Sequence, residues 1–182
     1  MSLAPWDYPY IANWFSSQGY NFFIVHYFDK TNTTFATPLN TAPAFGPWLQ
    51  VVNDATTWLS TQPGVDPSRI ALMGFSLGAS LGVSEASRDY RIKALAAWYG
   101  AEATWYENNV RNTITHMPAT IVIHGGNDPI SPMANAYALQ SLLQGLNVPC
   151  ALDIYPNEGH AFNPTDQNAA LQQTLTFFQQ YL

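Results

Sequence analysis

The sequence predicts an α/β fold in which a mostly parallel β-sheet lies between two layers of helices. Short apolar runs rich in β-branched and aromatic residues recur along the chain, and helical patterns separate them. These runs lack a strict alternation of polar and apolar residues, as expected of strands buried on both faces. Helices that alternate with such strands imply parallel pairing through right-handed crossovers, and hence a three-layer sandwich.

Five of the runs are predicted as strands, and the loops that follow them are the expected places for function. In chain order the runs are Asn21 to Phe28, Ile70 to Phe75, Ala94 to Tyr99, Ala119 to His124 and Cys150 to Tyr155. In parallel sheets the ligand site lies at the carboxyl ends of the strands. The stretch from Asp29 to Ala44 is rich in Thr, Asn and Pro, which predicts a surface loop.

Apolar residues spaced three or four positions apart predict the helices. The four stripes are Tyr8, Ile11, Ala12 and Phe15; Trp48, Val52, Ala55 and Leu59; Ala136, Leu139, Leu143 and Leu146; and Leu171, Leu175, Phe178 and Leu182. A further helix of small residues is expected directly after Ser76, from Leu77 onward. At 182 residues with 47% hydrophobic content, the chain is expected to form one domain over residues 1–182.

Charge and composition argue against several classes of partner. Six Lys and Arg against twelve Asp and Glu give a net charge of −6, so no basic surface is expected to hold a nucleic acid or an anionic membrane. The longest apolar runs are too short to cross a bilayer, and nothing at the start reads as a secretory leader. The expectation is a soluble protein.

Cysteine and histidine content points away from disulfides and metal sites. A single cysteine, Cys150, rules out an internal disulfide framework and favours the cytoplasm. His26, His116, His124 and His160 are scattered without metal-ligand spacing, so no metal is expected.

The segment GFSLGAS, Gly74 to Ser80, carries the first chemical signal. A predicted strand enters it and a predicted helix leaves it, and this strand–turn–helix context is what a nucleophile elbow requires. Glycine at positions 74 and 78 allows a strained turn and close packing of the helix on the strand, which lifts the Ser76 hydroxyl to the rim of the sheet. The alternative is a serine that caps a helix.

Two further loops supply the partners that a nucleophilic serine needs. IVIHGGNDPISP puts Asp128 just past the fourth run, and IYPNEGHAF puts His160 just past the fifth, so both are expected at the same sheet edge as Ser76. Taken singly, Asp128 reads equally well as a turn residue and His160 as an exposed loop residue. The order Ser, Asp, His favours a catalytic triad of the α/β-hydrolase type.

Over nearly its whole length the chain resembles the dienelactone hydrolase-like branch of the α/β-hydrolase superfamily. The segments that carry the resemblance are SSQGYNFFIVHYFD, GVDPSRIALMGFSLGAS, VIHGGNDPISP and YPNEGHAF. The resemblance implies ester or lactone hydrolysis without a cofactor. Dienelactone hydrolases proper carry Cys at the nucleophile position, whereas this chain has Ser76, which points to a general serine esterase.

Other titratable residues are weighed against this triad. Glu102, just beyond the third run, is a rival acid because some relatives place it there, and Asp128 has the better context. His26 and His124 are more simply explained as core or edge histidines bonded to the backbone. Cys150 begins its strand at the wrong end of the sheet for catalysis and is interpreted as a small buried apolar residue.

The predicted oxyanion hole is incomplete. In α/β-hydrolases one donor is the backbone N–H after the nucleophile, here Leu77, and the second comes from a loop between an earlier strand and the first helix. The resemblance implies that this strand precedes Trp6 in the chain. In the sheet it would lie between the strand Asn21 to Phe28 and the strand that leads into Ser76. The sheet is therefore expected to lack its N-terminal strands. The two flanking strands then pair directly, another chain fills the gap, or the sequence lacks a native segment.

The leading functional hypothesis is a serine hydrolase acting on small carboxylic esters or lactones through Ser76, His160 and Asp128. The alternative is a truncated, weakly active or inactive hydrolase-like module completed by a partner chain. An acyltransferase or thioesterase would share the triad and differ only in the acceptor. The expected ligand is a small-molecule ester or lactone. Neither a nucleic acid nor a membrane is expected as a partner. A homo-oligomer is one of the assemblies that the sequence allows.

Overall fold

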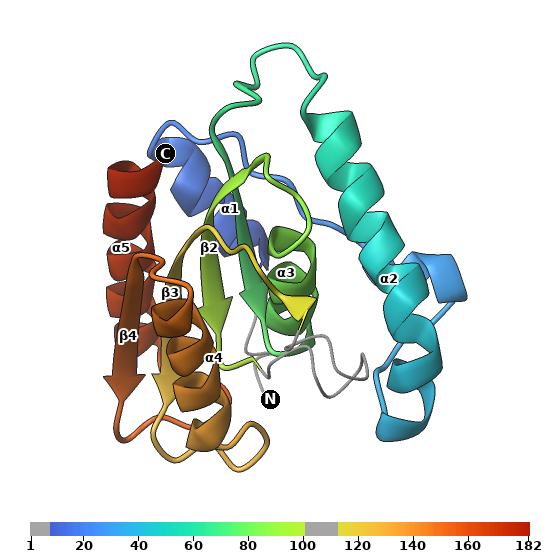
Figure 1. Cartoon of the computed structure of the whole chain (residues 1–182). Helices are drawn as coiled ribbons and strands as arrows, with labels where there is room; N and C mark the ends of the chain where they lie inside the picture. Colours follow the sequence, from blue (N-terminus) through green and yellow to red (C-terminus); the bar gives the residue numbers. More distant parts are fainter. Residues whose placement is uncertain (1–7, 101–112) are drawn as a thin grey trace.

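The predicted α/β architecture with a parallel sheet is confirmed by the computed structural model, which describes residues 8–100 and 113–182 (Figure 1). Within these ranges the sheet has four strands, and each pairs in parallel with the next in chain order. The strands are β1 (Ile70–Phe75), β2 (Ile92–Trp98), β3 (Ala119–Gly125) and β4 (Cys150–Tyr155). Their carboxyl ends therefore lie along one edge of the sheet.

Helices cover both faces of the sheet, as the periodic stripes predict. The helices described are α1 (Tyr8–Ser17), α2 (Pro38–Leu59), α3 (Leu77–Ala86), α4 (Met133–Gly145) and α5 (Pro164–Tyr181), with a short 3-10 helix η1 (Tyr27–Thr31). α1 and α5 pack on one face, and α3 and α4 pack on the other (Figure 1). α2 lies outside this layer, against α3 and η1.

The central strands are apolar because both of their faces are buried. In β2, Ala94 and Ala96 contribute to the core beneath α1 and α5, whereas Leu95 and Ala97 contribute to the core beneath α3 and α4. Successive side chains of a strand point to opposite faces, so a strand between two helical layers needs apolar residues at every position. This explains the absence of alternation in the sequence.

Small residues let α3 lie close to the sheet. Ala79 and Ala86 are fully buried, and a Cβ added to Gly82 would lie 3.1 Å from the Leu95 Cδ1 atom. This close packing fixes the first turn of α3 beside the carboxyl end of β1. The turn that contains Ser76 is thereby held rigidly at the sheet edge.

The prediction of a strand over Asn21 to Phe28 is wrong. The chain from Tyr20 to His26 has no regular secondary structure, and η1 begins at Tyr27. β1 forms one edge of the described sheet, and this segment does not pair with it. Some of its apolar side chains instead pack into two cores: the Phe22 ring stacks on Phe15 with centroids 5.5 Å apart, and Val25 packs beneath α2. Phe23 and Ile24 are exposed.

The prediction of a loop from Asp29 to Ala44 is wrong over its second half, because α2 begins at Pro38. The Thr37 side chain accepts a hydrogen bond from the Asn40 N–H, and the Asn40 side chain accepts one from the Thr37 N–H. This reciprocal cap, with proline at the first helical position, is a strong start signal. Pro43 and Pro47 lie inside the helix, and Pro43 belongs to the stretch whose Thr, Asn and Pro content predicted a loop.

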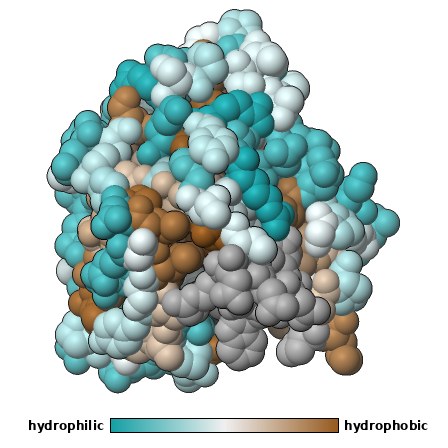
Figure 2. Space-filling view, viewed as in Figure 1, coloured by the Kyte–Doolittle hydropathy of each residue, from teal (hydrophilic) through white to brown (hydrophobic). Residues whose placement is uncertain are grey.

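The view in Figure 2 shows one face of the molecule coloured by hydropathy. Hydrophilic and neutral residues cover most of it, and the hydrophobic colour gathers in a patch left of centre. In the part of the chain that the structure describes, no helix combines the length and apolar character needed to cross a membrane.

Candidate active site

Ser76 occupies the sharp turn between β1 and α3. Its backbone has φ 52° and ψ −117°, a conformation that L-residues rarely adopt, and its N–H donates to the Trp98 carbonyl at 2.9 Å. A Cβ at Gly74 would lie 2.3 Å from the Gly78 carbonyl oxygen, so the turn closes only with glycine there. Backbone strain of this kind costs about 1–3 kcal/mol and persists where the surroundings enforce it.

Asp128 lies in the loop after β3, with its side chain fully buried. One carboxylate oxygen, Oδ1, accepts hydrogen bonds from the N–H groups of Ile130 and Ser131, both at 2.8 Å. The other oxygen, Oδ2, lies 2.8 Å from Nδ1 of His160. The turn thus fixes the carboxylate through one oxygen and leaves the other facing the imidazole.

His160 lies between the acid and the serine. Its Nε2 atom is 2.7 Å from the Ser76 hydroxyl oxygen. Because the Asp128 carboxylate can only accept, Nδ1 carries the proton in the neutral ring, which leaves Nε2 free to accept from Ser76. The structure therefore brings together all three side chains that the sequence singles out, in the order serine, imidazole, carboxylate.

The loop that carries His160 is held from two sides. A Cβ on Gly125 would lie 2.2 Å from the Gly159 carbonyl oxygen, so this glycine lets the end of β3 approach the histidine loop. The buried Glu158 side chain accepts hydrogen bonds from the backbone N–H and the side chain of Asn163, which caps α5. The role of Glu158 was not predicted from the sequence, because it depends on this contact within the folded loop.

The aromatic ring of Tyr99 lies beside the imidazole of His160. Tyr99 directly follows β2, is 2% exposed and has its ring centroid 5.3 Å from that of His160. Its φ of 36° is a second strained position at this edge, and its N–H donates to the Ile123 carbonyl at 2.7 Å. Burial raises the pKa of the Tyr99 hydroxyl far above its usual value, so Tyr99 stays neutral beside the site.

Leu77 is the first residue of α3. The first N–H groups of a helix have no partner within the helix, and they form the partial positive end of its dipole. The Leu77 N–H therefore lies at the positive end of α3, the charge environment expected of an oxyanion donor. The sequence-predicted second donor would come from residues before Trp6, and residues 1–7 lie outside the described ranges.

The other candidate residues lie away from the triad, outside the described residues or, in the case of His124, beside the acid. Glu102, the rival acid, lies outside the described residues. His26 is exposed at the start of η1, and Cys150 begins β4 at the opposite end of the sheet from the triad. His124 is fully buried beside Asp128 and bonds to a backbone carbonyl.

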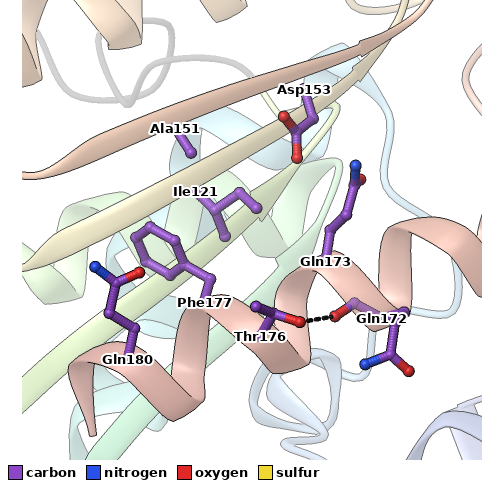
Figure 3. Close-up of a pocket in the computed structure, with 8 residues that line it drawn as sticks. All are labelled: Ile121, Ala151, Asp153, Gln172, Gln173, Thr176, Phe177 and Gln180. Atoms are coloured by element: carbon purple, nitrogen blue, oxygen red, sulfur yellow. Dashed lines mark hydrogen bonds between the residues drawn. The ribbon is translucent and has the colours of Figure 1, made fainter.

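A separate pocket lies between the sheet and α5 (Figure 3). Phe177 and Ile121 contribute apolar surface, Asp153 extends from β4, and Gln173 extends from α5. Burial raises the pKa of the Asp153 carboxyl above its usual value. Neither Ser76 nor His160 lines this pocket among the described residues, so it is distinct from the triad.

Known proteins resemble the chain in sequence and in fold. A provisionally assigned carboxymethylenebutenolidase of Escherichia coli (strain K12) is 28% identical over 146 residues, 73% of this chain and 54% of that protein. Esterase YpfH of the same strain is 32% identical over 111 residues, 60% of this chain and 46% of that protein. The chain spans about half the length of the curated relatives it matches.

Solved structures share the fold. The crystal structure of esterase PE8 matches with a TM-score of 0.67 at 22% identity, over 82% of this chain and 67% of that chain. The model of the dienelactone hydrolase family matches residues 9–182, nearly the whole sequence, and the chain therefore belongs to the dienelactone hydrolase family.

Proposed function

We propose that this chain is a serine hydrolase that cleaves small carboxylic esters or lactones. The observation that carries the proposal is the continuous hydrogen-bonded chain from Ser76 through His160 to Asp128, with distances of 2.7 and 2.8 Å. Membership of the dienelactone hydrolase family supports the same chemistry.

The mechanism begins with attack by the serine oxygen. His160 Nε2 removes the hydroxyl proton as Ser76 Oγ forms a bond to the carbonyl carbon of the ester, and the carbonyl oxygen becomes an oxyanion. The Leu77 N–H, at the positive end of α3, stabilises that oxyanion. Asp128 accepts from Nδ1 throughout and balances the positive charge of the imidazolium that forms.

The tetrahedral intermediate then collapses and the cycle repeats with water. The carbon–oxygen bond to the alcohol breaks, and His160 returns its proton to the leaving alkoxide, which leaves an acyl group on Ser76. Water then attacks this acyl-enzyme, with His160 taking the proton from water and passing it to Ser76 Oγ as the acid departs. Each proton that leaves an oxygen therefore returns to another oxygen through one imidazole.

A fluorophosphonate probe tests the proposal directly. The probe should phosphonylate Ser76 with loss of fluoride, and Ser76→Ala should abolish both labelling and hydrolysis of p-nitrophenyl acetate. Ser141→Ala is the matched control, because the exposed Ser141 hydroxyl donates to the Tyr137 carbonyl within α4, away from the triad. Folded wild-type protein that neither labels nor hydrolyses any short ester would refute the proposal.

The competing proposal is a hydrolase-like module that needs a partner chain for full activity. One observation favours it: β1 is an edge strand of the described sheet although Ala71, Leu72 and Met73 are apolar and only partly buried. An apolar strand edge without charge or proline is a template for pairing. Sedimentation with activity measured over a dilution series separates the two proposals, since a partner-dependent module loses activity per mole as it dissociates.

A further inference from the structure

His124, near the end of β3, lies directly behind the acid of the triad. Its side chain is fully buried, and its Nε2 atom is 2.8 Å from the Ser131 carbonyl oxygen. A carbonyl oxygen can only accept a hydrogen bond, so Nε2 must carry the proton. In the neutral ring Nδ1 is then unprotonated, and it is buried with no hydrogen-bond partner among the described residues.

Ser131 is the residue that ties the Asp128 turn together. Its N–H donates to Asp128 Oδ1 at 2.8 Å, and its hydroxyl donates to the Gly100 carbonyl at 3.2 Å. Its own carbonyl accepts from His124. The position of the Asp128 carboxylate therefore depends on Ser131, and Ser131 is held to β3 through the imidazole of His124.

The charge state of His124 matters because two imidazoles lie near one carboxylate. Asp128 Oδ2 is 2.8 Å from His160 Nδ1 and 3.8 Å from His124 Nε2, and these are the titratable groups that face His124. Burial lowers the pKa of His124 below its usual value. A neutral His124 leaves the negative charge of Asp128 to stabilise the imidazolium of His160.

Because Nδ1 of His124 has no hydrogen-bond partner among the described residues, we attribute the presence of an imidazole here to Nε2. A buried polar atom without a partner destabilises the fold, and an apolar residue of similar volume would avoid that penalty. The single hydrogen bond that the His124 ring makes within the described residues goes to Ser131. That bond is the physical reason to have an imidazole at this point of the core.

We propose that His124 is a positioning residue for ester hydrolysis, a neutral tether whose Nε2–H bond to Ser131 holds the Asp128 turn so that the carboxylate faces His160. The inference rests on the proposed function, because it assigns His124 a role in aiming the acid of that triad. His124 itself touches neither the serine nor a substrate bound to it.

A pair of variants separates the tether from simple core packing. His124→Gln places an amide N–H near the position of Nε2 and can still reach the Ser131 carbonyl, whereas the shorter His124→Asn cannot. Both side chains are neutral and polar, so they share the penalty of burying an amide. Circular dichroism and thermal melting establish that each variant is folded before kinetics with p-nitrophenyl acetate are measured.

The expected result is a loss confined to one member of the pair. Small misplacement of catalytic groups costs about 10²-fold in rate, so His124→Asn should lose about ten- to a hundredfold in kcat, with KM changed less than about threefold. His124→Gln should stay within about threefold of wild type in kcat. Equal kcat for the two folded variants, whether both high or both low, would overturn the proposal.

A measurement on the wild-type protein keeps the inference testable if either variant fails to fold. Histidine ¹⁵N–¹H spectra should show a slowly exchanging His124 Nε2–H with an unprotonated Nδ1 at neutral pH. The opposite tautomer, or a doubly protonated ring at that pH, would overturn the tether. This readout needs no activity, so a failure of the proposed function, seen as unlabelled Ser76, is distinguished from a failure of the tether.

Discussion

The Ser76 hydroxyl oxygen lies 2.7 Å from Nε2 of His160, although 84 positions separate the two residues in the chain. β1 and β4 occupy opposite edges of the described four-stranded sheet, so neither residue reaches the other through its own strand. The turn after β1 raises the serine over the strand ends, and the loop after β4 extends back across β3. Asp128, from the β3 loop, lies on the other side of the imidazole, at its Nδ1 atom.

Replacing Asp128 by Asn should reduce kcat strongly while the fold is retained. The amide oxygen can still accept from the N–H groups of Ile130 and Ser131, but the amide nitrogen then faces His160 and favours the wrong imidazole tautomer. The expected loss in kcat is about 10⁴-fold, with little change in KM. Steady-state kinetics measure kcat and KM, and a thermal melt tests whether the fold is retained.

Asp153→Asn is the control for this substitution. Asp153 is a half-buried carboxylate on β4 that lines the pocket beside α5, away from Ser76. Its removal should leave hydrolysis unchanged, because the carboxyl takes no part in the triad. If Asp128→Asn retained more than a tenth of wild-type kcat, the role of Asp128 as the triad acid would be wrong.

Gly74→Ala should destabilise the protein and impair the nucleophile turn. The new Cβ would lie 2.3 Å from the Gly78 carbonyl oxygen and 2.6 Å from the Ala79 nitrogen, so backbone atoms would have to move. Forcing extra atoms into a packed site typically costs about 1–3 kcal/mol. Denaturant unfolding measures the loss, and probe labelling measures the effect on Ser76.

Gly46→Ala provides the opposite control on the same chain. Gly46 is exposed within α2, and a Cβ there meets nothing within 4 Å. Alanine is favoured over glycine in a helix by up to about 1 kcal/mol, so this variant should be as stable as wild type or more so. A Gly74→Ala protein as stable as Gly46→Ala would show that the close approach at the elbow carries no constraint.

Local sequence patterns correctly predicted the strands that pair within the described sheet. β1, β3 and β4 follow directly from their apolar runs, because each finds a pairing partner and two covering layers. The run Asn21 to Phe28 has the same composition and forms no strand, because strand formation depends on a neighbouring backbone that the run itself does not specify. Apolar composition alone therefore does not decide the secondary structure, because a strand also needs a partner to pair with.

The sequence predicted the site residues that closely follow a predicted strand. Ser76, Asp128 and His160 each follow a predicted strand, so parallel topology alone brings them to one edge. Glu158 and Ser131 were missed because their roles depend on contacts across loops, to Asn163 in one case and to Gly100 in the other. Contacts of this kind produce no recognisable residue spacing in the sequence.

Asn163→Ala should lower the stability of the loop that carries His160. The Asn163 side-chain oxygen accepts from the N–H groups of Thr165 and Asp166 at the start of α5, and its amide donates to Glu158. Loss of such a cap costs about 0.5–2 kcal/mol. Asn163→Ser keeps a capping oxygen and should lose less, which denaturant unfolding can resolve; equal losses would mean that the cap contributes little.

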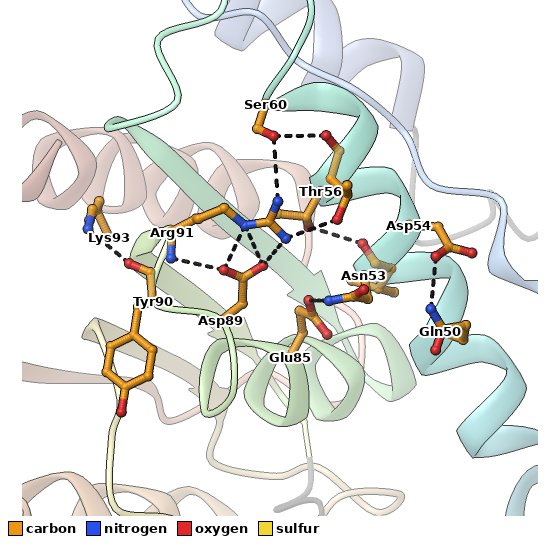
Figure 4. Close-up of polar contacts among 12 residues, drawn as sticks. Gln50, Asn53, Asp54, Thr56, Ser60, Glu85, Asp89, Tyr90, Arg91 and Lys93 are labelled. Atoms are coloured by element: carbon orange, nitrogen blue, oxygen red, sulfur yellow. Dashed lines mark hydrogen bonds and ion pairs between the residues drawn. The ribbon is translucent and has the colours of Figure 1, made fainter.

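Glu85→Gln should stabilise the protein by an amount that grows as pH rises. Glu85 is 2% exposed on α3, and its carboxylate accepts from the Asn53 amide of α2 at 2.8 Å (Figure 4). Burial, opposed in part by the Asn53 bond, raises the pKa of Glu85 above its usual 4.5. The folded protein therefore holds this proton more tightly than the unfolded chain does.

The sign of the effect follows from proton linkage. As pH rises above about 4.5 the unfolded chain releases its Glu85 proton first, so the contribution of Glu85 to the free energy of unfolding falls until pH passes the raised folded pKa. A glutamine cannot ionise and still accepts from Asn53, so the variant escapes this loss. The difference in melting temperature between Glu85→Gln and wild type should increase between pH 4 and pH 7.

Asp54→Asn is the matched control for the loss of a carboxylate near the same helix pair. Asp54 is exposed on α2 and accepts from Gln50 at 2.8 Å (Figure 4). Its removal changes net charge by the same amount without relieving any buried charge, so its effect on melting temperature should vary little with pH. A Glu85→Gln difference that is equally flat with pH would mean that burial leaves the ionisation of Glu85 unperturbed.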